Sequence, residues 1–400
     1  MEEWKEYKLD QVCENIYSGG TPATMIKEYW NGNLPWLSSG ETGQRYIYST
    51  EKTITQLGVD NSSTRYAYKN STVVASAGQG YTRGQASFLT IDTYVNQSVI
   101  VLKPNLKLID PKYLYFNIDN RYAELRQLSD GTSTRGSLSG KIMKDLSIKL
   151  PPLHTQQKIA TILSSLDDKI ELNNKINTNL EQQAQALFKN WFVDFEPFGG
   201  KMPEGWKVGK LSDIAEIKTD TFKPEQNPDI QVEHYSLPAF DEKRYPTFEI
   251  SNELKSNKFI ISDDEILVSK LNPTVKRVWQ PYCLTEKSIC STEFIVYKPI
   301  SVELKDYLFS IVNSSEFNDF MCSNVTGSTN SHQRTPPKTT LNYEIPIPTK
   351  EILHNFCNIV TPMYDKIKEN IKQNETVSSL RDTLLPKLMN GEVEVGEVII

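Results

Sequence analysis

Two stretches of this chain carry the same heptad pattern of core residues, which constrains the fold more than any other feature. In the first stretch, from about His154, the core positions are Ile159, Leu163, Leu166, Ile170, Asn173, Asn177, Leu180, Ala184, Leu187 and Trp191. In the second stretch, the corresponding core positions are Phe356, Val360, Met363, Ile367, Asn370, Asn374, Val377, Arg381, Leu384 and Leu388. Alternating spacings of four and three residues are typical of a coiled-coil seam. We therefore predict two long helices that pack on each other.

The asparagines in the two patterns predict how the helices pair. Asn173 and Asn177 lie near the middle of the first helix, and Asn370 and Asn374 lie near the middle of the second. These middles meet if the helices run antiparallel, and a buried asparagine fixes register because a slipped pairing leaves its amide without a partner. About 38 residues at 1.5 Å each give a rod of roughly 57 Å. The alternative is that the four asparagines are solvated residues on two surface helices.

The globular sequence outside the helices is repeated as well. Residues 206–213 restate the opening of the chain, residues 266–269 restate a buried strand at 72–76, and residues 294–299 restate another strand at 98–104. We predict an α/β (α+β) fold with a pseudo-two-fold internal repeat, in which two similar globular domains are separated by an antiparallel coiled coil. The predicted boundaries are 1–150 for the first domain, 151–196 for the central helix, 197–347 for the second domain and 348–392 for the C-terminal helix. Within the first domain, one helix is predicted from Asp110 to about Leu128.

Composition argues against several classes of protein. The chain has no run of about 18 apolar residues, so no transmembrane helix is expected, and its charged N-terminus lacks the apolar core of a signal peptide. The five cysteines are scattered, and no pair has the spacing of metal ligands. We therefore expect neither a disulfide framework nor a zinc site, which fits the reducing cytoplasm.

The sequence contains no convincing catalytic constellation. It has neither a phosphate-binding glycine loop nor a glycine signature for a dinucleotide or for AdoMet. His154 and His354 stand at helix starts with no carboxylate in register, and they are interpreted as surface residues. The acidic pair Asp167-Asp168 and the acidic run 263–265 are interpreted as solvated faces. We therefore expect a non-catalytic chain with no metal and no cofactor of its own.

Two polar loops near buried strands in each half carry the side chains that read the edges of DNA bases. Arginine donates two hydrogen bonds to guanine, and glutamine and asparagine pair with adenine. The candidate DNA-binding residues are Gln79, Tyr81, Arg83, Gln85, Thr134, Arg135, Lys270, Asn272, Lys276, Arg277, His332, Gln333 and Arg334. The formal net charge of -6 means that DNA binding has to depend on local patches or on partners. For any single residue, the alternative is an ordinary polar surface loop.

Several short segments, taken together and in order, resemble a known family. These segments are 148–153 (Ile-Lys-Leu-Pro-Pro-Leu) with Gln156 and Gln157 after it, 163–170 (Leu-Ser-Ser-Leu-Asp-Asp-Lys-Ile), 187–195 and 383–392. The chain resembles the DNA-specificity (S) subunit of Type I restriction-modification enzymes over its whole length.

The resemblance implies a division of labour within a larger complex. Each of two target-recognition domains would read one half of a bipartite, asymmetric site in double-stranded DNA, and the helices would act as a ruler that sets the unread spacer. Two modification (methyltransferase) subunits would dock on the helices, carry AdoMet and methylate adenine N6. Restriction (translocase and nuclease) subunits would use ATP and Mg. The S subunit itself would be non-catalytic.

Two alternatives and one departure remain at this point. The chain could be a coiled-coil protein-interaction scaffold without nucleic-acid specificity. It could also be a fused restriction-methylation enzyme, although two repeats leave no room for catalytic regions in 400 residues. Arg381 departs from the apolar seam, since Ala184 stands at the corresponding position of the first helix. We expect Arg381 either at the frayed end of the pair or facing a partner subunit.

Overall fold

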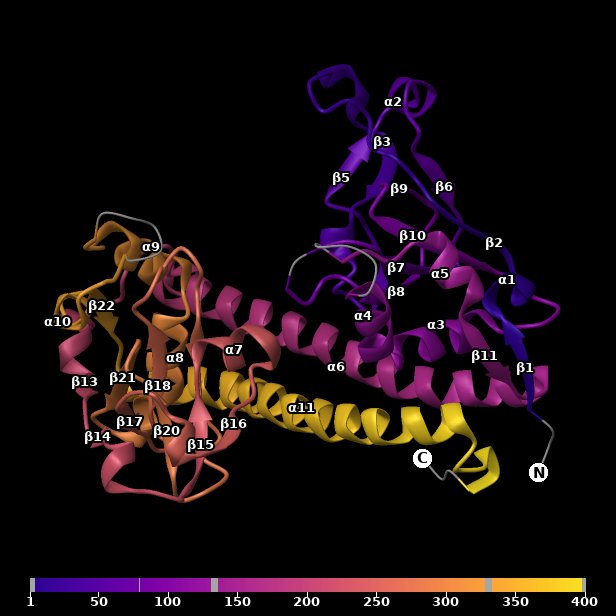
Figure 1. The fold of residues 1–400 in the computed structure, drawn as a ribbon. Coiled ribbons are helices and arrows are strands. Elements are labelled where there is room, and N and C mark those ends of the chain that lie inside the picture. The colour runs from indigo at the N-terminus through magenta and orange to yellow at the C-terminus, as the bar shows by residue number, and fades with distance from the viewer. Residues whose placement is uncertain (1–3, 79, 131–135, 328–332, 398–400) are drawn as a thin grey trace. The chain divides into compact units, whose positions relative to one another are not determined.

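The computed structural model describes residues 4–78, 80–130, 136–327 and 333–397. Contacts divide the chain into two compact units, Met1–Asp168 with Ser378–Ile400, and Lys169–Val377. Each unit contains one globular domain and a part of each of two long helices, α6 (Leu153–Phe192) and α11 (Lys350–Asn390), as Figure 1 shows. The compact units therefore differ from the four consecutive segments predicted from the sequence, because the helices are shared between them.

The first unit is built on a mixed five-stranded sheet. Its strands, in spatial order, are β2 (Cys13–Ser18), β10 (Val99–Pro104), β7 (Thr72–Ala75), β8 (Ala86–Leu89) and β4 (Tyr46–Ile47). A second sheet has the order β5 (Lys52–Ile54), β3 (Trp30–Leu37), β9 (Thr93–Val95) and β6 (Arg65–Ala67). The ends of the domain pair with each other as β1 (Lys5–Lys8) and β11 (Ser147–Leu150). Both buried strands predicted from the sequence are present, as β7 and β10.

The helices of the first domain are short. They are α1 (Leu9–Val12), α2 (Gln56–Asp60), α3 (Pro111–Asp119), α4 (Tyr122–Asp130) and α5 (Gly140–Asp145). The single helix predicted from Asp110 to Leu128 was wrong, because the chain turns after Asp119. The Arg121 amide bonds to the Ile118 carbonyl, three residues back, instead of continuing the α-helical ladder. Helix α3 packs between the sheet and the long helices, where Leu114 shares a buried core with Leu163 and Leu388 (Figure 1).

The second unit repeats the plan of the first. The equivalent sheet has the order β13 (Ala215–Lys218), β21 (Phe294–Pro299), β18 (Ile266–Ser269) and β19 (Val278–Trp279), and β12 (Lys207–Lys210) pairs with β22 (Glu344–Ile347). A second sheet has the order β14 (Thr221–Phe222), β17 (Lys258–Ile260), β20 (Ser288–Ser291), β15 (Gln231–Tyr235) and β16 (Thr247–Ile250). The helices are α7 (Leu237–Lys243), α8 (Lys305–Val312), α9 (Ser315–Ser323) and α10 (Pro337–Thr340). Register is kept as well as order, because Ile295 faces Val268 as Ile100 faces Val74.

Within each unit, the segments of α6 and α11 run antiparallel. In the second unit, the Asn173 amide donates to Asn374 Oδ1 across 2.8 Å and the Asn370 amide donates to Asn177 Oδ1 across 2.8 Å. The twenty core positions of the two heptad patterns are all buried or half-buried. The amides therefore pair across the helices instead of facing solvent, so the interpretation of them as solvated surface residues was wrong.

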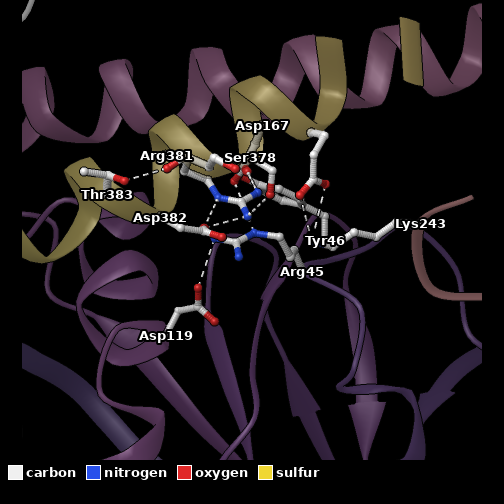
Figure 2. A network of polar contacts seen from close by, with 11 residues as sticks. Arg45, Tyr46, Asp119, Asp167, Lys243, Ser378, Arg381, Asp382 and Thr383 are labelled. Atoms are coloured by element: carbon white, nitrogen blue, oxygen red, sulfur yellow. Dashed lines mark hydrogen bonds and ion pairs between the residues drawn. The ribbon is translucent and has the colours of Figure 1, made fainter. Parts of the chain in front are cut away.

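Two other expectations about the helices were also wrong. Arg381 neither lies at a frayed end nor faces outward, because its side chain is 9% exposed and donates to Asp167 across 2.7 Å in the first unit (Figure 2). Asp167 is consequently buried, at 3% side-chain exposure, although it was interpreted as part of a solvated face.

In the second unit, Glu265 is also buried, and its carboxylate accepts from the Ser262 amide. No helix among the described residues is long and apolar enough to cross a membrane.

Candidate nucleic-acid interface

In the first domain, the structure brings the two predicted polar loops together. The predicted loops span residues 77–85 and 130–140, and the Leu138 amide of the second loop bonds to the Ser76 carbonyl at the end of β7 across 2.9 Å. The first loop turns back onto the same strand, since the Gly84 amide bonds to the Ala75 carbonyl across 2.9 Å. The described residues of the two loops therefore meet at one end of β7.

Arg83 joins the two loops instead of projecting from them. Its side chain is 8% exposed and forms an ion pair with Asp130 at the end of α4. A Cβ atom built at Gly136 would lie 1.9 Å from Arg83 Nη1, so the backbone at Gly136 lies directly against the guanidinium. In this structure Arg83 therefore supports the two loops, and its role as a base reader stays a prediction.

Side chains of helix α4 are hydrogen-bonded to the backbone at the tip of the first loop. Arg126 Nη1 donates to the Gly80 carbonyl across 2.8 Å, and the Tyr122 hydroxyl donates to the Tyr81 carbonyl across 2.9 Å. Because these bonds reach the backbone, the Tyr81 side chain is free to point outward, and it is 83% exposed. Gly80 has a φ of 68° and no atom within 4 Å of its Cβ direction, so the backbone at the tip is open to a close approach.

The remaining first-domain candidates have different positions. Gln85 is half-buried, and its side-chain amide lies near Gly43. Gln79, Thr134 and Arg135 lie outside the described residues, and so does His332 of the second domain. Tyr81 is therefore the described candidate of this domain with a clearly outward side chain.

In the second domain, the two predicted loops are hydrogen-bonded to each other directly. The Asn272 amide donates to the Gln333 carbonyl across 2.9 Å, and the Thr335 amide donates to the Lys270 carbonyl across 3.1 Å. Asn272 has a φ of 47°, a left-handed conformation that asparagine tolerates better than most residues. The loop pair thus recurs in both domains, with different side chains and a different set of contacts.

The lysine and arginine candidates of the second domain, which are all described, have partners within the domain. Arg277 forms a two-pronged ion pair with Asp241, with distances of 2.6 and 2.8 Å. Arg334 does the same with Glu293, at 3.0 and 2.9 Å, and this lowers the pKa of Glu293.

The two lysines donate to backbone carbonyls. Lys270 Nζ reaches Thr292 across 2.7 Å, and Lys276 Nζ reaches Asn313 across 2.8 Å. Burial lowers the pKa of Lys276. Lys270, Lys276, Arg277 and Arg334 thus each have a partner within the domain, beside the loop pair.

Sequence reasoning did not find the residues that hold the loops. Tyr122 and Arg126 lie one helical turn apart on α4, which places both on one face. No residue pattern indicated that this face lies beneath a loop more than forty positions earlier in the chain. Asp130, Asp241 and Glu293 were missed for the same reason, because a lone carboxylate does not reveal its partner in the sequence.

Metal and disulfide chemistry is not evident in the described part of the chain. In residues 4–78, 80–130, 136–327 and 333–397, no group of three or more histidine, cysteine or acidic side chains could hold a metal ion. The five cysteines are free thiols, and burial raises the pKa of Cys13 and Cys283 to about 12. These thiols are consequently poor nucleophiles at neutral pH.

Comparison with protein families decides between the possible roles of this repeated scaffold. A model described as the Type I restriction modification DNA specificity domain matches residues 1–182 and again residues 203–376. The chain belongs to the family of Type I restriction-modification specificity subunits. The resemblance noted in the sequence is therefore confirmed.

Relatives of this specificity subunit match it over nearly their full lengths. It is 30% identical over 422 residues to the Type I restriction enzyme MjaIX specificity subunit of Methanocaldococcus jannaschii, covering 99% of this chain and 95% of that one. It is 24% identical over 473 residues to the HindI specificity subunit of Haemophilus influenzae, covering 98% and 100%. The crystal structure of the S subunit of a Type-I restriction-modification system from M. genitalium aligns with a TM-score of 0.61 and 16% identity, covering 97% and 96%. That structure supports the predicted fold of two domains and a coiled coil.

Proposed function

We propose that this specificity subunit reads a bipartite, asymmetric site in double-stranded DNA, one half with each domain. The observation that carries the proposal is the convergence of two polar loops at one place in both domains, on sheets that share strand order and register. The scaffold is repeated, whereas the loops differ in sequence, so the two domains would recognise different bases. This is the arrangement that an asymmetric site requires.

The partners follow from the family. Two methyltransferase subunits would dock on α6 and α11 and supply AdoMet, and restriction subunits would supply the chemistry that needs ATP and Mg. Both would work with this chain in the cytoplasm, and the coiled coil would set the unread spacer. The alternative of an interaction scaffold without DNA specificity is not favoured, because the family model matches both globular domains as well as helical residues.

The direct test is to sequence DNA modification in cells that express this chain with its modification subunit. We expect methylated adenines within one split motif that has two defined halves and a fixed unread spacer. Methylation that is absent, although the complex assembles and binds AdoMet, would contradict the proposal. So would methylation at a continuous, unsplit motif.

The Tyr81→Ala variant tests whether the loop tip of the first domain contacts DNA. Because Tyr81 is 83% exposed, its loss should leave folding unchanged. Loss of a stacking or phosphate contact should lower methylation at native sites by about fivefold or more, equivalent to about 1 kcal/mol. The matched control is Tyr68→Ala, an exposed tyrosine that follows β6, which should methylate at the native rate. Equal rates for both variants would remove the loop tip of residues 80–81 from the interface.

A further inference from the structure

The first domain is joined to the long helices by a network of buried and half-buried charges. The network contains Arg45, next to β4, Asp119 at the end of α3, Asp167 of α6 and Arg381 of α11 (Figure 2). Arg45 Nη2 lies 3.0 Å from Asp119 Oδ2, and Arg45 Nε lies 3.5 Å from Asp167 Oδ2. Four segments that are far apart in the sequence thus meet in one cluster, which we call the Asp167 network.

The Asp167 carboxylate is shared between the second helix and the globular domain. Arg381 Nη1 donates to Oδ1 across 2.7 Å, while the Tyr46 hydroxyl donates to Oδ2 across 2.8 Å. Arg381 is itself steered by Ser378 Oγ at 2.9 Å and by Asp382 Oδ1 at 2.9 Å on its own helix. Because one carboxylate has partners on both sides, a slip of α11 along α6 or a turn of the domain breaks at least one of them.

The environment makes each of these bonds costly to break. Asp167 and Arg381 are 3% and 9% exposed, and burial raises the pKa of Asp119. Asp167 and Arg381 have little access to water, so a displaced domain would leave a buried charge without its counter-charge. Burial also raises the pKa of Tyr46, whose hydroxyl stays protonated as a donor at neutral pH.

The second domain is attached in another way. In the repeat, the positions of Asp167 and Arg381 correspond to Tyr364 and Ala184, which both lie in the apolar core of the second unit. The Tyr364 hydroxyl lies 2.8 Å from Ser310 Oγ, a neutral contact. The ion pairs Arg244–Glu181 and Lys243–Glu375 are more exposed, with their basic side chains 49% and 48% accessible. The shared buried carboxylate is therefore a feature of the first unit, where the internal symmetry is broken.

We propose that Asp167 and Arg381 are positioning residues that hold the first domain in one orientation on α6 and α11, and thereby make the complex accept a single spacer length. The inference rests on the proposed reading of a split site. Adding one base pair to the spacer moves a half-site by roughly 3.4 Å and rotates it by about 35°. A domain that could slip or turn by these amounts would accept neighbouring spacers, and the Asp167 network opposes both motions.

The test measures spacer tolerance separately from base recognition. The assembled complex with its modification subunits methylates a pool of DNA in which both half-sites are native and the spacer is native, one base pair shorter or one longer. We expect Asp167→Asn and Arg381→Met to lower discrimination against the altered spacers by about tenfold. The bases required in each half-site should not change. Arg381→Lys, which keeps the charge, should largely restore discrimination.

The matched control is Arg244→Met, which removes an exposed ion pair between a domain and α6 in the second unit. This variant should still methylate only DNA with the native spacer length. If the complexes with Asp167→Asn and Arg381→Met do not assemble, Tyr46→Phe can be used instead, because it removes one hydrogen-bond donor and leaves every charge paired. It should lower the discrimination against altered spacers by a smaller factor. The inference would be overturned if the variants methylated only DNA with the native spacer, whether fast or slowly. It would also be overturned if the base requirements relaxed while the accepted spacer length stayed the same. A wild-type complex without a split motif would instead overturn the proposed function.

Discussion

Arg381 of α11 donates to Asp167 of α6 across 2.7 Å, and both side chains are less than a tenth exposed. Removing one partner of a buried pair typically costs up to about 3–5 kcal/mol, although Asp167 here keeps Arg45 at 3.5 Å and the Tyr46 hydroxyl at 2.8 Å. We therefore expect Arg381→Met to lower the free energy of unfolding of the full chain by an amount in this range, measured by urea denaturation. The double variant with Asp167→Asn should lose less than the two single variants combined, because neither charge is then stranded.

The control for this prediction is Lys366→Met, which removes an exposed pair with Glu369 on α11. Exposed pairs of this kind contribute little to stability because solvent screens them, so this variant should unfold close to the wild type. Equal stabilities of Arg381→Met and Lys366→Met would mean that the buried pair contributes nothing beyond a surface contact.

A second prediction concerns the asparagines between the helices. Asn370 is 1% exposed and donates to Asn177, so Asn370→Ala leaves a buried amide oxygen without its donor. The expected cost is about 1–3 kcal/mol, visible as a lower melting temperature. Asn179→Ala, on an exposed position of α6, is the comparison and should melt near the wild type. Replacing Asn177 and Asn370 together by leucine should recover stability, at the expense of a fixed register.

A third prediction uses two glycines of the first domain. Gly136 has a φ of 61°, and a Cβ there would meet the Arg83 guanidinium at 1.9 Å, whereas a Cβ at Gly140 meets nothing within 4 Å. Gly136→Ala should therefore destabilise the domain by more than about 1 kcal/mol and weaken methylation, because it displaces the arginine that joins the loops. Gly140→Ala, at the first position of α5, should be neutral or slightly stabilising. The pair is best compared by thermal unfolding alongside methylation rate.

Position in the sequence explains why some of these features were predictable and others were not. The seam between α6 and α11 was visible because heptad spacing is a local property, and the four asparagines marked its middle. Burial of Asp167 was not visible, because it depends on Arg45, more than a hundred residues earlier, and on Arg381, more than two hundred later. Arg83 carries the chemistry of a base reader, and only its contacts with Asp130 and Gly136 identify it as internal.

A fourth prediction concerns pH and the second domain. Burial lowers the pKa of His234 below its usual 6.5, although Glu249 lies 3.1 Å from Nδ1 and opposes the shift, while Lys258 adds to it. The folded state therefore binds a proton less readily than the unfolded state, so stability is present above about pH 6.5 and is lost as the pH falls through the lower folded value. Unfolding free energies between pH 7.5 and pH 5 should show this loss.

The His234→Gln variant should flatten that dependence, whatever its stability at neutral pH. Exposed His354 at the start of α11 provides the comparison, and His354→Gln should keep the wild-type profile. An undiminished acid loss in His234→Gln would assign the effect to other groups.

The first compact unit combines Met1–Asp168 with Ser378–Ile400, and Leu385 and Leu388 belong to its core. During translation, the domain that is synthesised first therefore cannot complete its core until the last part of the chain has been made. The second unit is one continuous segment and needs nothing that is synthesised later than Val377. Translation that stops in α11 after Val377 but before Leu385 would release a chain whose first half has an open apolar face, while its second half is already complete.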